Sequence, residues 1–224
     1  MATEPPREFR QARFEAPQGA TQLLLVRHGE SEPARPDRPF PTVDGHGDPA
    51  LAPEGHEQAE AVARRLGGEP IDALYVTTLQ RTALTAAPLV ERLGMEPRVE
   101  PDLREVHLGE WERGLLRQKA AERDPVFLEV MREERWDVIP GAEPEEAFAS
   151  RVVGAVERIA STHPDELVVA VVHGGVIGQI LGHATGAGGF AFSGADNGSI
   201  HRLVLTEERW VVRSFNEVAH LPEA

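Results

Sequence analysis

The sequence predicts an α/β protein, folded as a three-layer α/β/α sandwich around a mostly parallel central sheet. Short, largely apolar segments at residues 22–27, 73–76 and 167–172 are typical of strands buried on both faces. Segments with the 3.6-residue spacing of amphipathic helices lie between them, as expected when helices connect parallel strands. No linker divides the chain, so we expect an N-terminal tail over residues 1–20 and a single domain over residues 21–224.

Local signals place the elements of the first half of the chain. The tail is polar and contains several prolines, which favours an irregular segment. The strand at 22–27 is followed by a loop over 28–50, where proline and glycine are too frequent for regular structure. A loop of this length in a compact domain is often functional. Pro53 suits the first position of a helix, and Gly67 and Gly68 end that helix.

The strand at 73–76 leads into a second helix. We expect Thr78 to cap the amino end of this helix and Gly94 to end it. Pro88 lies inside the helical pattern and is expected to kink the helix. A short strand is expected at 96–99, after this helix.

The second half of the chain continues the alternation of helices and strands. Residues 114–135 predict one or two amphipathic helices, with a break near Asp124 and Pro125. Pro144 opens another helix, whose apolar face consists of Phe148, Val152, Ala155 and Ile159. The chain is completed by a strand at 167–172, a helix over 176–183, a glycine-rich loop over 185–199, and a terminal hairpin with strands at 200–205 and 210–215.

The composition excludes several classes of protein. The chain has 224 residues, of which 41% are hydrophobic and 27% charged, as is usual for a globular protein. It contains no cysteine, which excludes disulfides, zinc ribbons and thiol nucleophiles. A net charge of −14 opposes binding to nucleic acid. The longest apolar run, residues 167–172, is too short to span a membrane, and no signal-peptide pattern is present, so we expect a cytoplasmic protein without membrane or nucleic-acid partners.

Two predicted strands end in the same kind of sequence. The first runs into Arg27-His28-Gly29-Glu30-Ser31, and the strand at 167–172 runs into His173-Gly174-Gly175. Because ligands of parallel sheets bind at the carboxyl ends of the strands, we expect His28 and His173 to face one crevice. A glycine after each histidine lets the backbone approach an anion. A single histidine at a strand end is equally well explained as a hydrogen-bonded turn residue, so the prediction depends on the pair.

Several motifs in order resemble those of the histidine phosphatase superfamily, in its phosphoglycerate-mutase-like branch. The resemblance covers residues 22–216 and implies the same α/β fold, together with phosphoryl transfer through a phosphohistidine. It rests on RHGES at 27–31, ALAPEGHEQAEAVARRL at 50–66, YVTTLQRTALTAA at 75–87, LREVHLGEWE at 103–112, VVHGGVI at 171–177 and NGSIHRL at 197–203.

The resemblance implies a role for each matching residue. His28 is the nucleophile, with His173 as a donor to the phosphoryl oxygens and Glu105 as the proton donor and acceptor. The phosphate is bound by Arg27, Arg81 and Gly174. The chemistry agrees, because arginine offers a planar pair of donors to a phosphoryl group. His28 must be neutral to attack phosphorus, with its other ring nitrogen held by an acceptor, for which we expect a backbone carbonyl. Because the two arginines and a histidine supply the positive charge that a phosphoryl group requires, we expect no metal and no cofactor.

The sequence departs from the family pattern in the loop that follows His28. Position 34, where relatives commonly carry an asparagine that helps to bind phosphate or substrate, is Ala34. The loop over 32–50 is also unusual, and its role is open. We expect substitute contacts from Arg35, Arg38 and Phe40, and a further substrate contact from Ser31. The helical insert over 113–140 contributes further arginines, either to the substrate pocket or to a solvated helix face: Arg113, Arg117, Arg132 and Arg135.

The segment around Glu105 distinguishes two activities. Mutases of the family usually carry Glu-Arg-His-Tyr-Gly here, whereas this chain has Glu105-Val106-His107-Leu108-Gly109, which resembles the broad phosphatase subgroup. We therefore favour a phosphomonoesterase acting on a small phosphorylated metabolite. A phosphoglycerate-mutase-type phosphotransferase and a non-catalytic phospho-ligand binding protein remain alternatives. The oligomeric state is open, with a homodimer as one alternative.

Two other segments carry weaker signals. The residues Asp44-Gly45-His46-Gly47-Asp48 include metal-ligand types, but a turn is the better explanation in a loop rich in glycine and proline. The glycine-rich loop over 185–199 lacks both common nucleotide-binding patterns. Within it, Asn197 and Ser199 either face the pocket or form a turn.

Overall fold

A central sheet organises the computed structural model, which describes residues 8–222. Within these residues six strands form the sheet in the order β5-β4-β6-β1-β7-β8. The pairs β1·β6, β4·β6 and β4·β5 are parallel, whereas β7 pairs antiparallel with β1 and with β8. The mostly parallel sheet is thus confirmed. The strands are β1 (Thr21–Arg27), β4 (Ala73–Val76), β5 (Arg98–Val99), β6 (Leu167–Val172), β7 (Ile200–Leu205) and β8 (Trp210–Glu217).

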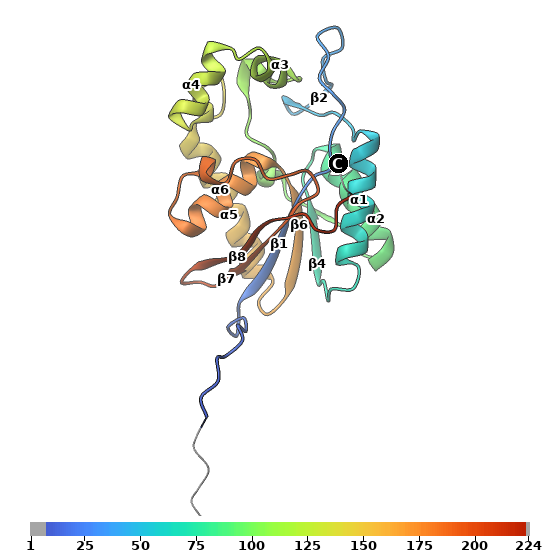
Figure 1. Ribbon diagram of the computed structural model, residues 1–224, viewed down its shortest axis with the longest axis vertical. Helices are drawn as coiled ribbons and strands as arrows, with labels where there is room; N and C mark the ends of the chain where they lie inside the picture. The colour runs from blue at the N-terminus through green and yellow to red at the C-terminus, as the bar shows by residue number, and fades with distance from the viewer. Residues whose placement is uncertain (1–7, 223–224) are drawn as a thin grey trace, which may run out of the picture.

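Helices cover both faces of the sheet, which confirms the three layers. Helices α1 (Pro53–Leu66) and α2 (Gln80–Leu93) lie together on one side, and α5 (Glu145–Thr162) and α6 (Gly174–Thr185) lie on the other (Figure 1). Side chains of a strand alternate between faces, so β1 contributes to two separate cores. Leu23 and Leu25 pack with Phe148 of α5, while Leu24 packs with Leu66 of α1.

The helical insert consists of two short helices, α3 (Leu115–Ala121) and α4 (Pro125–Glu133). The break between them falls at Asp124 as predicted, because the carboxylate of Asp124 accepts a hydrogen bond from the amide of Val126 and caps α4. Both helices lie above the end of the sheet that is opposite the N-terminal segment (Figure 1). This is the end at which β1 finishes, so the insert covers the predicted crevice. Single turns of 3₁₀ helix connect the elements: η1 (Pro101–Leu103), η2 (Gly109–Trp111), η3 (Trp136–Val138) and η4 (Gly189–Phe192).

Two predictions about local structure were wrong. The loop over 28–50 contains a small hairpin, with strands β2 (Thr42–Val43) and β3 (His46–Gly47). Its turn has positive φ at Asp44 and Gly45, as tight hairpin turns require. Thr78 does not cap α2, because its hydroxyl is buried without a hydrogen-bond partner among the described residues. Asp48, directly after the hairpin, caps the amino end of α2 instead, since its Oδ1 accepts a hydrogen bond from the amide of Gln80 at 2.9 Å.

The remaining elements follow the predicted order with small shifts of their ends. Helix α2 continues through Pro88 and ends at Gly94 in a left-handed conformation. Residues 8–19 of the predicted tail form no helix or strand, and residues 1–7 lie outside the described part of the chain. The guanidinium carbon of Arg213 lies 3.8 Å from the ring centre of Phe14 in this segment. None of the helices within residues 8–222 is long and apolar enough to cross a membrane.

Candidate active site

The parallel pairing of β1 and β6 brings the two predicted histidines together. Arg27 is in register with Val172, so the residues that follow, His28 and His173, leave the sheet at the same edge. The amide of His28 donates to the carbonyl of Val172 at 3.0 Å, and the centres of the two imidazole rings are 5.2 Å apart. The shared crevice expected from the strand ends is therefore present.

His28 has the protonation and orientation of a nucleophile. Its Nδ1 lies 2.8 Å from the carbonyl of Gly29, and its Nε2 accepts a hydrogen bond from Nε of Arg81 at 3.2 Å. Burial, together with the neighbouring guanidinium groups of Arg81 and Arg27, holds the pKa of His28 well below its usual value. The ring is neutral near pH 7, and the Gly29 carbonyl is the backbone acceptor that fixes the proton on Nδ1. With the proton on Nδ1, Nε2 carries the lone pair, and in this structure that lone pair accepts the hydrogen bond from Arg81.

The turn that carries His28 is held from three sides. The amide of Gly29 donates to Oγ1 of Thr85 in α2 at 2.9 Å. A Cβ added to Gly29 would lie 2.4 Å from the carbonyl oxygen of Gly55 in α1, so no larger residue fits there. Nδ2 of Asn197 donates to the carbonyl of His28 at 2.8 Å. Asn197, in the glycine-rich loop, therefore positions the backbone of His28.

Arg81 is buried and is held by the β2–β3 hairpin. Its Nη1 donates to the carbonyl of Gly47 at 3.0 Å and lies 3.8 Å from Oδ1 of Asp48. Burial lowers the pKa of Arg81, and Glu105 and Asp48 counteract this effect. The segment over 44–48 is thus a turn that supports an arginine. No group of three or more His, Cys, Asp or Glu side chains within residues 8–222 has the arrangement of a metal site.

Arg27 completes the cationic side of the site. Its Nη1 donates to the carbonyl of Ala195 in the glycine-rich loop. Burial lowers the pKa of Arg27, an effect that Glu105 opposes. Gly174 lies beside Arg27 at the start of α6, where an added Cβ would be 3.5 Å from Nε of Arg27.

Glu105 lies at the amino end of α6, where its carboxylate accepts from backbone amides. Oε2 accepts from the amide of Gly175 at 3.2 Å, and Oε1 accepts from the amide of Val106 at 3.0 Å. A Cβ added to Gly175 would lie 2.5 Å from Oε1, so a side chain there would displace the carboxylate. The second glycine after His173 thus makes room for the predicted proton donor.

Arg151 of α5 holds the segment that carries Glu105, and sequence reasoning missed it. Its Nη1 donates to the carbonyls of Asp102 and Arg104 at 2.7 Å each, and its Nη2 donates to the carbonyl of Glu105 at 2.9 Å. An ion pair with Glu143, at 2.7 Å, fixes the guanidinium. The signal in the sequence was an arginine next to the apolar face of a predicted helix.

His173 is fully buried behind His28. Its Nε2 lies 3.0 Å from Oγ1 of Thr77, whereas Nδ1 has no hydrogen-bond partner within residues 8–222. Burial and the charge of Arg81 hold the pKa of His173 well below its usual value, so this ring is also neutral. Thr77 follows β4, the third parallel strand to end at this edge. The position of Thr77 directly after a predicted strand was the signal that identifies it.

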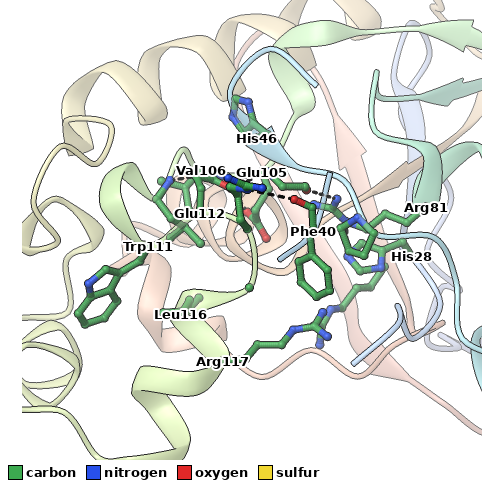
Figure 2. Close-up of a pocket in the computed structure, with 16 residues that line it drawn as sticks. His28, Phe40, His46, Arg81, Glu105, Val106, Trp111, Glu112, Leu116 and Arg117 are labelled. Atoms are coloured by element: carbon green, nitrogen blue, oxygen red, sulfur yellow. Dashed lines mark hydrogen bonds between the residues drawn. The ribbon is translucent and has the colours of Figure 1, made fainter. Parts of the chain in front are cut away.

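Arg27, His28, Arg81 and Glu105 line a cavity of about 180 Å³, and the ring of His173 lies beside that of His28. Figure 2 shows His28 and Arg81 on one side of it and Glu105 on the other. An adjoining cavity of about 270 Å³ shares Arg27 and Glu105 with the first and includes Gly174 in its lining. The structure thus brings together the residues that were predicted to carry catalysis and to bind the phosphate. These are Arg27, His28, Arg81, Glu105, His173 and Gly174.

The residues expected to contact the substrate are placed differently. Ser31 is buried, and its hydroxyl accepts a hydrogen bond from Nη2 of Arg117 at 2.7 Å. Arg35 and Arg38 line a separate cavity of about 480 Å³. Phe40 belongs to the lining of both cavities and separates them. The structure therefore does not bring Arg35 and Arg38 to the side of His28.

The family model that matches this chain describes the histidine phosphatase superfamily (branch 1), and the match extends over residues 23–218. The chain belongs to the histidine phosphatase superfamily. Among its relatives, a metal-independent phosphoserine phosphatase of Arabidopsis thaliana is 33% identical over 209 residues, covering 90% of this chain and 83% of the plant protein. Phosphoserine phosphatase 1 of Hydrogenobacter thermophilus is 31% identical, covering 90% of this chain and 95% of the bacterial protein.

Solved structures of this superfamily share the fold. A mycobacterial glucosyl-3-phosphoglycerate phosphatase is 29% identical with a TM-score of 0.72, covering 88% of this chain and 99% of that one. The same enzyme with inorganic phosphate bound matches with a TM-score of 0.72. A phosphoglycerate mutase from Bacillus anthracis, at 21% identity and a TM-score of 0.76, covers 91% of this chain and 96% of its own, and supports the fold alone.

Proposed function

We propose that this member of the superfamily is a phosphomonoesterase, which hydrolyses a small phosphorylated metabolite through a phosphohistidine on His28. The observation that carries the proposal is the state of His28, a neutral imidazole with its Nδ1 held by the Gly29 carbonyl and its Nε2 lone pair directed at Arg81. The names of the relatives support hydrolysis, since they include phosphoserine and glucosyl-3-phosphoglycerate phosphatases.

In the first step the phosphoryl group is transferred to the enzyme. Arg27 and Arg81 neutralise the negative charge of the phosphate with charge-assisted hydrogen bonds. His28 Nε2 attacks phosphorus, the bond from phosphorus to the ester oxygen breaks, and the protonated carboxyl of Glu105 gives its proton to the leaving oxygen. The alcohol leaves through the adjoining cavity, which shares Arg27 and Glu105 with the phosphate cavity.

In the second step water removes the phosphoryl group from His28. The Glu105 carboxylate takes a proton from the water molecule as its oxygen attacks phosphorus. The bond between phosphorus and Nε2 breaks, inorganic phosphate is released, and the carboxyl is protonated again for the next cycle. His173 supports both steps: its ring lies next to that of His28, and its Nδ1, which has no hydrogen-bond partner within residues 8–222, donates to a phosphoryl oxygen.

The proposal is tested with a panel of phosphorylated metabolites, with a chelator present, by measuring phosphate release. The wild-type protein should turn over at least one of them, whereas His28→Ala should release no phosphate. A matched control is His56→Ala, since His56 is an exposed residue of α1 away from the cavity. Turnover that survives in His28→Ala, or that disappears with the chelator, would overturn the mechanism.

The same assay separates the two alternatives. Rapid isomerisation of 3-phosphoglycerate in the presence of 2,3-bisphosphoglycerate, with no phosphate released, would identify a mutase instead. Failure of every phosphomonoester to label His28 with phosphate would identify a binding protein. Hydrolysis is expected because the cavity adjoins a second one, which gives water a path to the phosphohistidine.

A further inference from the structure

A third arginine reaches the phosphate cavity from the helical insert. Arg117 lies on α3, and its side chain extends back to the turn that follows β1 (Figure 2). Its Nη2 donates to Oγ of Ser31 at 2.7 Å, and its Nη1 donates to the carbonyl of Glu32 at 2.9 Å. The guanidinium carbon lies 5.5 Å from the ring centre of Phe40. Although the residue as a whole is exposed at the mouth of the cavity, these three contacts partly bury its guanidinium and fix it in place.

Close packing at Gly114 allows α3 to approach this turn. A Cβ added to Gly114 would lie 2.9 Å from Cβ of Ala34 and 3.0 Å from the ring of Phe40. Gly114 also has a φ of +97°, which favours glycine, and it is the residue that precedes α3. The small residues at 34 and 114 therefore bring the start of α3 against the loop, and this places Arg117 within reach of Ser31.

The electrostatics of the cavity show that Arg117 acts on the catalytic groups. Its positive charge lowers the pKa of Arg27, of Arg81 and of His28, in addition to the larger effect of burial. Burial also lowers the pKa of Arg117 itself, and the charge of Glu30 opposes this. The positive charges of Arg27, Arg81 and Arg117 thus all act on His28.

The carboxylates of the cavity do not balance these charges. Glu105 and Glu112 both belong to its lining. The oxygens of Glu112 accept from the amides of Gly47 and Leu108, at 2.6 and 2.8 Å, so this carboxylate is engaged with the backbone. The lining also holds four arginines, Arg27, Arg81, Arg113 and Arg117, so it carries more guanidinium groups than carboxylates in a chain whose net charge is −14. A dianion placed among the arginines removes their mutual repulsion.

We propose that Arg117 is a third phosphoryl-binding arginine, which donates hydrogen bonds to the same PO₃ group that Arg27 and Arg81 hold. This proposal rests on the proposed function for the location of the phosphate, but it does not require turnover. Ser31 and Glu32 take one N–H from each of two guanidinium nitrogens, and the remaining N–H donors are left for the ligand. Ser31 then acts as a positioning residue for Arg117.

The test measures binding of inorganic phosphate and orthovanadate by calorimetry, because neither ion has a leaving group. Arg117→Gln should raise the dissociation constants of both ions by about tenfold or more, as expected for loss of a charged hydrogen bond. Arg117→Lys keeps the positive charge but loses the planar pair of N–H donors, so it should recover part of the lost affinity. The control is Arg132→Gln, which removes one positive charge from the neighbouring α4, where Arg132 is exposed and pairs with Glu129 and Glu133. Circular dichroism and the melting temperature verify that each variant is folded.

Two outcomes would overturn the assignment of Arg117. One is an unchanged affinity for both ions in Arg117→Gln. The other is a loss of kcat/KM that is confined to phosphomonoesters with an anionic leaving group, since this would place Arg117 at the leaving group. A wild-type protein that binds both ions in an Arg117-dependent manner but releases no phosphate from any ester would support Arg117 and contradict hydrolysis. The two proposals therefore fail separately.

Discussion

Arg151 binds the backbone of Glu105, with its Nη2 donating to the Glu105 carbonyl at 2.9 Å. The carboxylate of Glu105 is bound separately, by the amide of Gly175 at the amino end of α6. The proposed proton donor is therefore oriented by two helices on the same face of the sheet. One guanidinium binds three carbonyls of the segment, at residues 102, 104 and 105. The position of the proton donor depends on this contact, which lies outside the cavity.

Replacing Arg151 should separate catalysis from phosphate binding. In Arg151→Met the segment around Glu105 loses its anchor, so kcat should fall by about ten- to a hundredfold through misplacement of the carboxyl group. The inhibition constant of inorganic phosphate should stay within about twofold, because Arg27 and Arg81 are untouched. Arg158→Met is the control, since Arg158 lies on the same helix but bonds only to side chains, those of Glu100 and Asp102. Equal losses in kcat and in phosphate affinity would show a general disruption of the site.

Replacing Glu105 should give a loss that depends on the leaving group. In Glu105→Gln no proton is available for an alkoxide, so kcat/KM for an alkyl phosphate such as glycerol phosphate should fall by about 10²- to 10⁴-fold. A p-nitrophenyl ester needs little protonation, so its transfer step should fall much less. Phosphohistidine should then accumulate, since water attack also lacks its base, and rapid-quench sampling detects this species. A loss of the same size for both esters would remove Glu105 from the proton transfer.

The nucleophile should stay neutral in mildly acidic solution. Burial and two guanidinium groups lower the pKa of His28, so its protonation is expected well below pH 6.5. The measurement is a pH titration of the histidine ring nitrogens by NMR, with His28 assigned through His28→Gln. The same chain unfolded in urea gives the reference, where histidine titrates near its usual value of about 6.5. A midpoint for His28 near this reference value would contradict the proposed nucleophile.

Stability should decrease in acid partly through His201. This buried histidine accepts a hydrogen bond at Nδ1 from the amide of Asn216, and burial lowers its pKa to about 4. The unfolded chain binds a proton near pH 6.5 and the folded chain only near pH 4, so the free energy of unfolding falls as the pH drops through this window. The loss attributable to His201 is about 3 kcal/mol when the window is complete.

Urea unfolding at neutral pH and at about pH 5 measures this effect. His201→Gln keeps a polar side chain but cannot be protonated, so it should show a smaller difference in unfolding free energy between the two pH values, by about 2 kcal/mol. Other buried histidines, such as His28, contribute to both proteins alike. The same pH dependence in both proteins would show that His201 binds its proton equally in the folded and unfolded states.

The strand ends explain why so much of the site could be predicted from the sequence. A buried parallel strand is recognisable from its own residues, and its carboxyl end lies at a known edge of the sheet. His28 and His173 follow such strands directly, so their meeting follows from local patterns together with one rule of topology. The family resemblance added Arg81 and Glu105, neither of which follows a predicted strand of this kind.

The contacts of the supporting residues could not be predicted, because their partners are distant in the chain. Asp48 caps a helix that begins 32 positions later, and no local rule relates the two, so Thr78 was the natural but incorrect choice. The contacts of Arg151 and Arg117 span 46 and 86 positions. Arg35 and Arg38 were expected at the site because of their charge and their nearness to His28, but Phe40 lies between the two cavities.

The connection from β1 to α1 serves the cavity at both of its ends. His28 lies at its beginning, and the hairpin that holds Arg81 lies near its end, while the middle of the connection forms a turn at residues 35–38 that faces a different cavity. We therefore expect insertions or deletions in this middle part to leave His28 and Arg81 in place. Natural variation in loop length at this point can therefore reshape the outer surface of the enzyme while the chemistry stays constant.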